Sequence, residues 1–555
     1  MKSKFAQILP VFAALIGLNV LASFVPFRVD LTEDKRFSLS EATERLLTNL
    51  DDEVVVKVYL AGDDLPAGFE RLQNAVRETL DEMQATAGSR LSYRFIDPAT
   101  VSSDPKERTK FYESLAARGI PPTNVVQGGS DSRSERLVFP GAVLSYRGRE
   151  VTALLLRGNI AHSAQENLNL SYENVEFQLA TALRELTNTE KKRLGLLNTF
   201  SRVPAGRLAD LITSLQRNYD FFTVNLSASP TLEGLDAVLL IKPDTLMAEA
   251  DKFKLDQFIV KGGRALFFVD ALAIDSVGRE GTYAYPARLN LDDLLFNYGA
   301  RVNPNLVKDL LCAQIPLNVG NLGDKPQLQL MPWRFFPLLN SFGPSVITRN
   351  LDAVYTRFAG TLDTVRADGI VKTPLLLTSR YTQLVKAPAL VTYNEARQQP
   401  DPRAYDAGPK LISVLLEGRF ESLYKNRILP GDPRANGFVP QGQPSKILVC
   451  SDGDLPLNDF DFRQNRPLPL GFDRFSADRH VFSNKEFILN AVDYLVDENG
   501  VITARNKAVR LRPLDALQLR ENRPFWQALN LALPLVLIGG LGRVVQVVRR
   551  RKFAR

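Results

Sequence analysis

The chain has 555 residues and a formal net charge of +7, of which Lys2, Lys4 and the six bases of residues 543–555 supply +8. Residues 28–542 therefore carry a net charge of −1. A middle region so close to neutral excludes the broad basic surface that nucleic-acid binding needs. It is also too long for a single hydrophobic core, and its length predicts two to four domains.

The N-terminal stretch from Phe5 to Phe27 is nearly all apolar, and Lys2 and Lys4 precede it. It is long enough to cross a bilayer as a helix, and the two lysines place its start on the cytoplasmic side. We therefore predict an anchor over residues 1–27. The alternative is a cleaved signal peptide that ends at Val20-Leu21-Ala22. No Cys follows this stretch, which excludes a lipoprotein.

Residues 28–170 are predicted to form a small α/β domain. Val54 to Leu60 is an apolar run typical of a buried strand, and Leu91 to Ile96 is a second strand. Between them, apolar residues recur at helical spacing from Phe69 to Leu80, so the three segments form a βαβ unit. Residues 137–156 then predict a hairpin. The arrangement is similar to a thioredoxin-like domain, but it lacks Cys-x-x-Cys, so redox chemistry is excluded.

Residues 171–512 predict a larger α/β domain in which apolar strands alternate with helices. Such alternation favours a parallel sheet covered on both faces, with any ligand beyond the carboxyl ends of the strands. Three of these ends carry Asn198-Thr199-Phe200-Ser201, Lys242-Pro243-Asp244 and Asp270, and Ser451-Asp452-Gly453-Asp454 follows a further strand. Residues 281–443 are rich in Pro and predict a loop-rich insertion or subdomain.

The C-terminal stretch from Phe525 to Gly542 is again nearly all apolar, and a basic cluster follows it. This pattern predicts a membrane helix over residues 524–548 and a cytoplasmic tail over 549–555. With the anchor at the other end, it gives a two-span inner-membrane protein with a large periplasmic region. A buried core helix with a solvated basic tail is the alternative. The bases that set this topology are Lys2, Lys4, Arg549, Arg550, Arg551 and Lys552.

Several segments resemble the gliding-motility-associated ABC transporter auxiliary proteins of the GldG family. They are residues 289–299 (LNLDDLLFNYG), 301–304 (RVNP), 414–418 (VLLEG), 451–454 (SDGD) and 482–492 (FSNKEFILNAV). The resemblance runs nearly end to end, including both anchors. It implies a protein that works with a permease subunit and, through it, an ATPase subunit. It also implies a second domain similar to class I glutamine amidotransferases but without their activity.

Signatures of catalysis are absent from the sequence. There is no G-x-x-x-x-G-K-[ST] phosphate loop, no H-E-x-x-H and no G-x-S-x-G, and the chain holds only His162 and His480. ATP hydrolysis by that loop, a His-based zinc site and a hydrolase elbow are therefore excluded. Cys450 ends a strand, but no His pairs with it in the pattern. The sequence thus predicts no enzyme activity and no cofactor.

Three residues are candidates for binding. Asp452 and Asp454 could hold a cation or a sugar hydroxyl, although Asp-Gly-Asp is also typical of a tight turn in which the carboxylates cap backbone amides. Trp333 could stack on a sugar or a partner, and core packing is its alternative. Cys312 and Cys450 could pair in an oxidising compartment, or stay as two buried thiols.

Two functions of different class follow from these observations. The first is a non-catalytic transport subunit whose periplasmic body binds cargo, either an envelope polysaccharide or a protein, and whose spans contact membrane lipid and the permease. The second is a membrane-anchored enzyme or binding protein for cell-envelope glycans that uses Asp452 and Asp454. A structural tether in gliding or secretion machinery is a third hypothesis.

Overall fold

The computed structural model describes residues 38–62, 65–129, 132–156, 164–187, 191–322, 325–428, 435–475, 480–496 and 500–502, with scattered residues between 525 and 551. The chain divides into two compact units, Met1–Lys507 and Ala508–Arg555. Within the described residues, no helix combines the length and the apolar character needed to cross a bilayer.

Most of the residues on which the predicted membrane topology depends lie outside the described part of the chain. The anchor over residues 1–27, with Lys2 and Lys4, lies outside the described residues, as does much of the helix predicted over 524–548. Arg549 and Lys552 also lie outside them. Arg550 and Arg551 are described and are helical.

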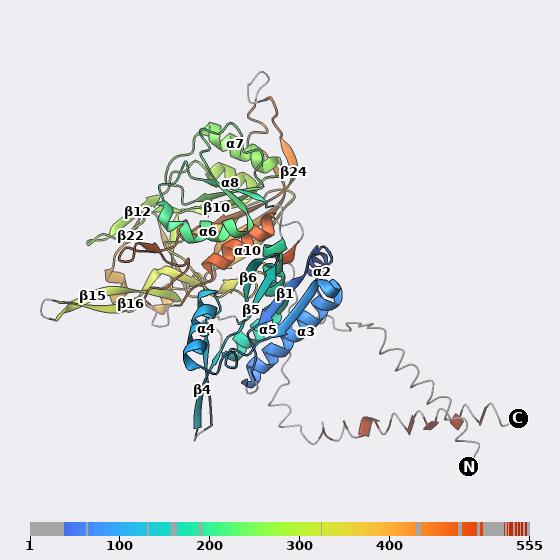
Figure 1. Cartoon of the computed structure of the whole chain (residues 1–555). Helices are drawn as coiled ribbons and strands as arrows, with labels where there is room; N and C mark the ends of the chain where they lie inside the picture. Colours follow the sequence, from blue (N-terminus) through green and yellow to red (C-terminus); the bar gives the residue numbers. More distant parts are fainter. Residues whose placement is uncertain are drawn as a thin grey trace, which may run out of the picture. The chain divides into compact units, whose positions relative to one another are not determined.

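The first sheet has four strands in the order β2-β1-β5-β6 (Figure 1). β1 (Val54–Val58) and β2 (Leu91–Phe95) are parallel and are joined by α3 (Ala67–Ala87), which is the predicted βαβ unit. β5 (Gly141–Tyr146) and β6 (Arg149–Leu154) form the predicted antiparallel hairpin. Its two turn residues have positive φ, 48° and 77°, as a tight type I′ turn requires.

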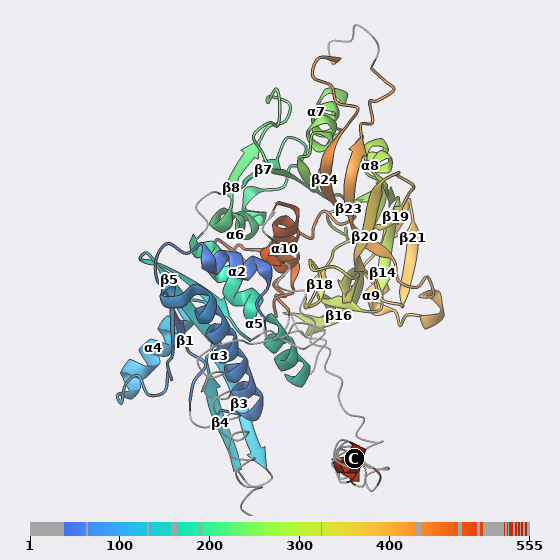
Figure 2. The same cartoon turned by 90° about the vertical axis from the view of Figure 1, so that its right-hand side faces the viewer.

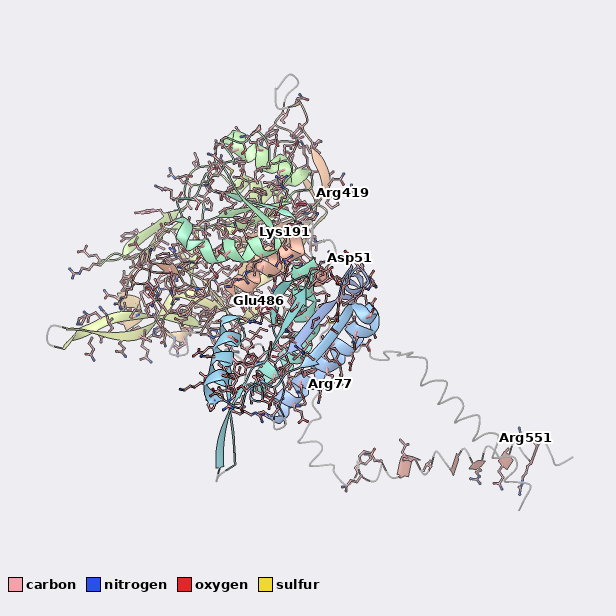
Figure 3. All side chains as sticks on the ribbon, viewed as in Figure 1. Asp51, Arg77, Lys191, Arg419, Glu486 and Arg551 are labelled. Atoms are coloured by element: carbon pink, nitrogen blue, oxygen red, sulfur yellow. The ribbon has the colours of Figure 1, made fainter. Side chains whose placement is uncertain are left out.

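Helices cover this sheet with apolar faces. α3 buries Phe69, Leu72, Val76 and Leu80, and most of its charged residues, Arg77 among them, are exposed (Figure 3). The other elements are α2 (Glu41–Thr48), η1 (Gly88–Arg90), α4 (Pro105–Ala117), α5 (Ala164–Thr187) and the hairpin β3 (Thr123–Gly129) and β4 (Ser132–Val138).

The long helix α5 joins the first sheet to the second. It packs on α3 and β6, and Leu168 and Leu183 belong to the core of the first sheet. Arg184 Nη2 also lies 2.7 Å from Asp493 Oδ2 on α10 (Asn484–Val496), and both side chains are largely buried. α5 begins at Ala164, so the polar stretch before Leu170 forms its first turns. The reason is that Leu168 has a core to pack against.

The second sheet has ten strands, and five of them form its parallel half. Their order is β24-β10-β9-β7-β8, and every neighbouring pair is parallel. The chain moves from β7 outward to β8 and then crosses to β9 on the other side of β7. The topological switch point therefore lies between β7 and β9. The five strands are β7 (Arg193–Leu197), β8 (Asp220–Val224), β9 (Ala237–Ile241), β10 (Arg264–Phe268) and β24 (Gln441–Cys450).

Both faces of this parallel half are covered (Figure 1). In β9, Leu239 and Ile241 pack with α6 (Ala209–Asn218) and α10, whereas Val238 and Leu240 pack with the helices of the other face. Those helices are α7 (Glu249–Val260) and α8 (Asp292–Tyr298). Because both faces are buried there, the inner strands β9 and β10 are nearly continuous apolar runs, as expected for a covered parallel sheet.

Residues 281–443 contain far more strand than the Pro-rich pattern predicts. β23 (Leu411–Glu421) pairs antiparallel with β24, and β19 (Thr361–Thr364) and β20 (Ile370–Leu377) extend the sheet beyond it (Figure 2). β15 (Cys312–Leu322) and β16 (Lys325–Leu339) form a long outer hairpin. β16 tolerates three prolines because it pairs along most of its length on one side only.

The remaining elements are short. They are η2 (Ala205–Arg207), β11 (Leu272–Ala273), β12 (Thr282–Pro286), β13 (Ala300–Asn303), β14 (Asn305–Asp309), β17 (Ser341–Phe342), β18 (Val354–Tyr355), β21 (Thr382–Lys386), β22 (Ala389–Val391), α9 (Asn394–Arg397), η3 (Pro402–Ala404), β25 (Phe460–Asp461) and β26 (Arg466–Pro467).

Candidate functional site

The carboxyl ends of three parallel strands meet at one edge of the second sheet. Phe268, the last residue of β10, pairs with Ile241 of β9 and with Cys450 of β24, so the three ends are in register. Lys242 and Asp270 follow two of these ends, and Asp452 and Asp454 follow the third. The fold thus brings together side chains that the sequence placed at separate strand ends.

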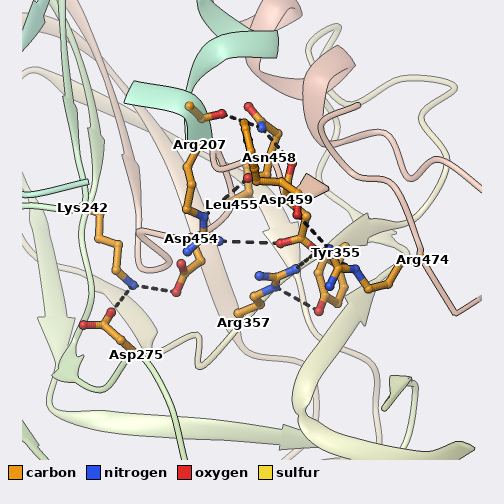
Figure 4. Close-up of polar contacts among 12 residues, drawn as sticks. Arg207, Lys242, Asp275, Tyr355, Arg357, Asp454, Leu455, Asn458, Asp459 and Arg474 are labelled. Carbon is orange, nitrogen blue, oxygen red and sulfur yellow. Dashed lines mark hydrogen bonds and ion pairs between the residues drawn. The ribbon is translucent and has the colours of Figure 1, made fainter. Parts of the chain in front are cut away.

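Lys242 is the centre of the first group of charges. Its Nζ lies 2.6 Å from Asp454 Oδ2 and 2.9 Å from Asp275 Oδ1 (Figure 4). It also lies 2.9 Å from Asp270 Oδ2. The side chain of Lys242 is only 11% exposed. We call Lys242, Asp270, Asp275 and Asp454 the lysine cluster. Burial opposes the charge of Lys242, but the carboxylates of Asp270 and Asp454 raise its pKa above the usual value, so it stays protonated.

The backbone around the lysine cluster packs closely against the side chains of the cluster. Lys242 has a φ of 45°, a left-handed conformation that is unfavourable for a residue with a Cβ. The backbone N of Gly453 donates a 2.6 Å hydrogen bond to Asp270 Oδ1. A Cβ at Gly453 would lie 2.9 Å from both Asp270 Oδ1 and Lys242 Cγ. Only glycine therefore lets the loop after β24 approach so closely.

Asp452 is fully buried beneath this loop and caps backbone amides. Its Oδ1 accepts hydrogen bonds from the N of Asp454 at 2.7 Å and of Leu455 at 3.1 Å, and its Oδ2 accepts one from Arg357 N at 2.8 Å. This is the tight turn that the sequence pattern allowed. Burial raises the pKa of Asp452 well above its usual range, and burial also raises the pKa of Asp270 to about 6.

The residues at this edge do not fit a metal ion. Asp270, Asp452 and Asp454 each have a carboxylate oxygen within 4.8 Å of the others, a spacing that would suit a divalent cation. However, the ammonium group of Lys242 contacts Asp270 and Asp454, and backbone amides occupy both oxygens of Asp452. The chain supplies its own cation here.

The two cysteines are free thiols and do not pair. Cys450 is fully buried at the end of β24, and burial raises the pKa of its thiol well above the usual value. Burial also raises the pKa of Cys312 to about 12. A thiol is a good nucleophile only as a thiolate, so neither residue is prepared for catalysis.

A second group of charges lies beside the lysine cluster. Asp459 accepts a 3.0 Å hydrogen bond from Arg357, and Arg207 and Arg474 approach it to 3.8 Å and 3.7 Å (Figure 4). Tyr355 accepts a 3.0 Å hydrogen bond from Arg357 Nε. We call Arg207, Arg357, Arg474 and Asp459 the arginine cluster. Burial opposes the charge of Asp459, but Arg357 and its neighbours hold the pKa of Asp459 below its usual value.

The loop from Asp452 to Asp459 crosses the edge of the sheet from β24 to the loop after β7. At its far end, Asn458 N donates to Arg207 O at 2.8 Å, and Asn458 Nδ2 donates to Gly206 O at 3.0 Å. The loop therefore runs over the carboxyl ends of β10 and β9, next to the switch point where sheets of this type usually bind ligands. The chain itself occupies that position.

Trp333 lies elsewhere, in the core of the outer strands. It is 1% exposed, and its ring centroid is 5.3–6.2 Å from those of Phe335, Phe336 and Tyr393. This is the core packing that was the alternative to stacking on a ligand.

The sequence analysis did not identify Arg207, Arg357, Asp459 or Arg474. Arg357 follows the short strand β18, Arg207 ends the short helix η2, and Asp459 and Arg474 lie in loops after β24. Lone arginines in loops have no characteristic spacing. They come together because the loop after β24 crosses back toward the segment that follows β7.

The comparisons with known proteins agree with the general resemblance. A family model described as an ABC-type uncharacterized transport system matches residues 191–491, more than half of the chain. The chain belongs to this family. The match supports an auxiliary protein of an ABC transport system, which is the general part of the sequence-based prediction, and it does not test the link to gliding motility.

Other comparisons add little about function. A model of a domain of unknown function matches residues 33–145. An uncharacterized protein of Borreliella burgdorferi is 22% identical over 501 residues, covering 87% of this chain and 92% of that relative. A solved structure titled "mmIFT52 N-terminal domain" is 14% identical and covers 55% of this chain and 97% of its own. Its TM-score of 0.29 is too low to carry an argument.

Proposed function

We propose that this member of the ABC-type transport family is a non-catalytic auxiliary subunit of an inner-membrane ABC transporter. The family match over residues 191–491 is the observation that carries the proposal. In this proposal a membrane span near each end of the chain holds the two α/β domains, one thioredoxin-like and one amidotransferase-like, in the periplasm. The link to gliding motility rests on the resemblance alone.

The energy for transport would come from partners. The sequence given contains no Walker-type phosphate loop of the form G-x-x-x-x-G-K-[ST]. We therefore propose that a permease subunit contacts the two spans and that a cytoplasmic ATPase subunit acts through the permease.

The periplasmic body would bind cargo or a partner without chemistry of its own. The buried lysine cluster supports this proposal, because Lys242 is held by three carboxylates and the loop after β24 covers the usual ligand position. The same contacts disfavour an enzyme that acts on envelope glycans through Asp452 and Asp454. Envelope polysaccharide and protein are the two cargo classes that we propose.

Co-purification tests this function. The full chain, purified from its own membrane in mild detergent, should bring a permease subunit and an ATPase subunit with it. A chain that lacks residues 525–555 should lose both. The control is Arg366→Gln, a side chain that is 91% exposed, which should leave the complex intact. A complex that forms equally well without residues 525–555, or the absence of any transport subunit from the full-chain preparation, would contradict the proposal.

A further inference from the structure

The arginine cluster contains three positive charges and one negative charge, so it has a net positive charge. Arg207, Arg357 and Arg474 each pair with Asp459, and among the described residues this is the only carboxylate with which any of them forms an ion pair. The side chains of Arg207, Arg357 and Arg474 are 33%, 22% and 41% exposed. One carboxylate thus faces three accessible cations, and the surplus charge is available to an anion from solution.

The charge continues onto the small hairpin that follows Asp459. β25 and β26 pair antiparallel, and β26 packs against η2, which ends at Arg207. Arg463 and Arg466 on this hairpin are both exposed. We call the arginine cluster and residues 460–467 together the arginine surface. Although the sum of charges over residues 28–542 is close to zero, the fold concentrates five arginines here.

An aromatic side chain projects from the same hairpin. Phe462 is 87% exposed, which is the largest exposed fraction among the described large hydrophobic residues. The ring of Phe462 contacts solvent on nearly all sides, with its centroid 5.3 Å from that of Phe460. A fully exposed phenylalanine beside arginines is typical of a segment that enters the headgroup region of a bilayer.

A cavity of ≈500 Å³ opens beside the hairpin. Its wall is mostly apolar, with Pro467, Leu468 and Phe472 on one side and α6 on the other, and Arg466 also lines it. Asp210 in this wall is already paired with Lys485 at 2.9 Å. An apolar hollow next to an exposed arginine suits a molecule with an anionic head and an apolar chain.

We propose that the arginine surface docks onto anionic phospholipid, with guanidinium groups on the headgroup phosphates and Phe462 at the acyl boundary. The proposal rests on the proposed function in one respect, because a body tethered to a bilayer at both ends meets lipid at a high effective concentration. Free phosphate satisfies the arginines but leaves Phe462 without a role, so the exposed ring favours lipid as the source of the phosphate.

Short-chain lipids that do not form bilayers test this inference on the full chain. The protein, held in micelles of a neutral detergent, is titrated by calorimetry with dihexanoylphosphatidylglycerol, dihexanoylphosphatidylcholine and inorganic phosphate. The phosphatidylglycerol probe should bind more tightly than the other two. Arg463→Gln with Arg466→Gln should weaken its binding by about 30-fold. Arg366→Gln with Arg380→Gln, two exposed arginines in other loops, should not change it.

Phe462→Ala separates lipid from free phosphate as the ligand. It should weaken the binding of the phosphatidylglycerol probe and leave the binding of inorganic phosphate unchanged. Equal affinity for the two lipids, inorganic phosphate binding as tightly as the anionic lipid, or wild-type affinity in the Arg463 and Arg466 variant would each overturn the inference. Because no transport partner takes part in this assay, its failure is distinct from a failure of co-purification with a permease.

Discussion

The lysine cluster and the arginine cluster lie at the same edge of the second sheet but have opposite proportions of positive and negative side chains. In the lysine cluster, one ammonium group that is 11% exposed meets three carboxylates. In the arginine cluster, three guanidinium groups that are 22–41% exposed share one carboxylate. The one buried ammonium group contacts every carboxylate of its cluster, because a buried charge without a counter-charge inside the chain is costly. Where water reaches the groups, surplus charge persists and can recruit a ligand.

The largest expected effect comes from removing the cation of the buried cluster. Lys242→Met leaves Asp270 and Asp454 without their counter-charge in a buried setting, and it should lower the free energy of unfolding by about 3–5 kcal/mol. Urea denaturation of the full-length protein, followed by tryptophan fluorescence, measures the change.

Lys261→Met is the matched control, since Lys261 is 42% exposed and lies 4.0 Å from Glu233. It should change the free energy by less than about 0.5 kcal/mol. If the two variants are equally stable, the lysine cluster does not hold the edge of the sheet together.

The second effect is a pH dependence that belongs to the buried cluster alone. Burial raises the pKa of Asp270 from 3.8 to about 6, so between these pH values the folded protein holds more protons than the unfolded chain. Stability is then lost as pH rises through this window. The free energy of unfolding of the wild type, relative to that of Asp270→Asn, should fall by roughly 1–3 kcal/mol between pH 4 and pH 7.

Urea midpoints of both proteins across that range give the difference. A difference that rises with pH, or that does not change, would show that burial does not disfavour the ionised form of Asp270 in the folded protein.

A smaller effect is expected at the arginine cluster, and it has two parts. Asp459→Asn removes the only carboxylate among the described residues that pairs with these three guanidinium groups, so it should cost about 1–2 kcal/mol of stability. The same change frees the guanidinium groups for an outside anion, so the affinity for the phosphatidylglycerol probe should rise several-fold.

Asp368→Asn serves as the comparison, because the Asp368 side chain is 86% exposed and pairs with Arg366 in another loop. It should leave the lipid affinity close to that of the wild type. A loss of lipid affinity in Asp459→Asn would mean that Asp459 is part of the binding site and not a competitor for it.

The smallest expected change is in the stability of Phe462→Ala. With 87% of the residue already in water, truncation of the ring should alter the free energy of unfolding by less than about 0.5 kcal/mol. Thermal unfolding of the full-length variant measures it. A destabilisation of several kcal/mol would mean that Phe462 is packed in the folded protein and is not free to enter a bilayer.

Local patterns predicted much of both sheets. The apolar run at Val54, the helical spacing from Phe69 to Leu80 and the apolar strand at Ala237 all form the expected elements, since each buries a face that its own sequence defines. The strand content of residues 281–443 was missed. Prolines in β16 resemble loop signals, and only the one-sided pairing of that strand makes them compatible with a hairpin.

The candidate site was predicted in part. Parallel strands bring their carboxyl ends together, so the neighbourhood of Lys242, Asp270 and Asp454 follows from the order of elements. The partners of Asp459 do not follow from it, because they depend on how the long loops cross the edge of the sheet. The burial of Trp333 could not be predicted either, because the local sequence of an outer strand does not indicate whether a tryptophan ring on it is buried.

Hydrogen exchange of the full chain in two bilayers tests the contrast between the two clusters most directly. The protein is reconstituted in nanodiscs of phosphatidylcholine, with and without phosphatidylglycerol. We predict that backbone amides of residues 460–467 become protected only when phosphatidylglycerol is present, while those next to Lys242 and Asp452 are equally protected in both. Equal exchange of residues 460–467 in the two bilayers, or faster exchange beside Lys242 with the anionic lipid, would contradict the account.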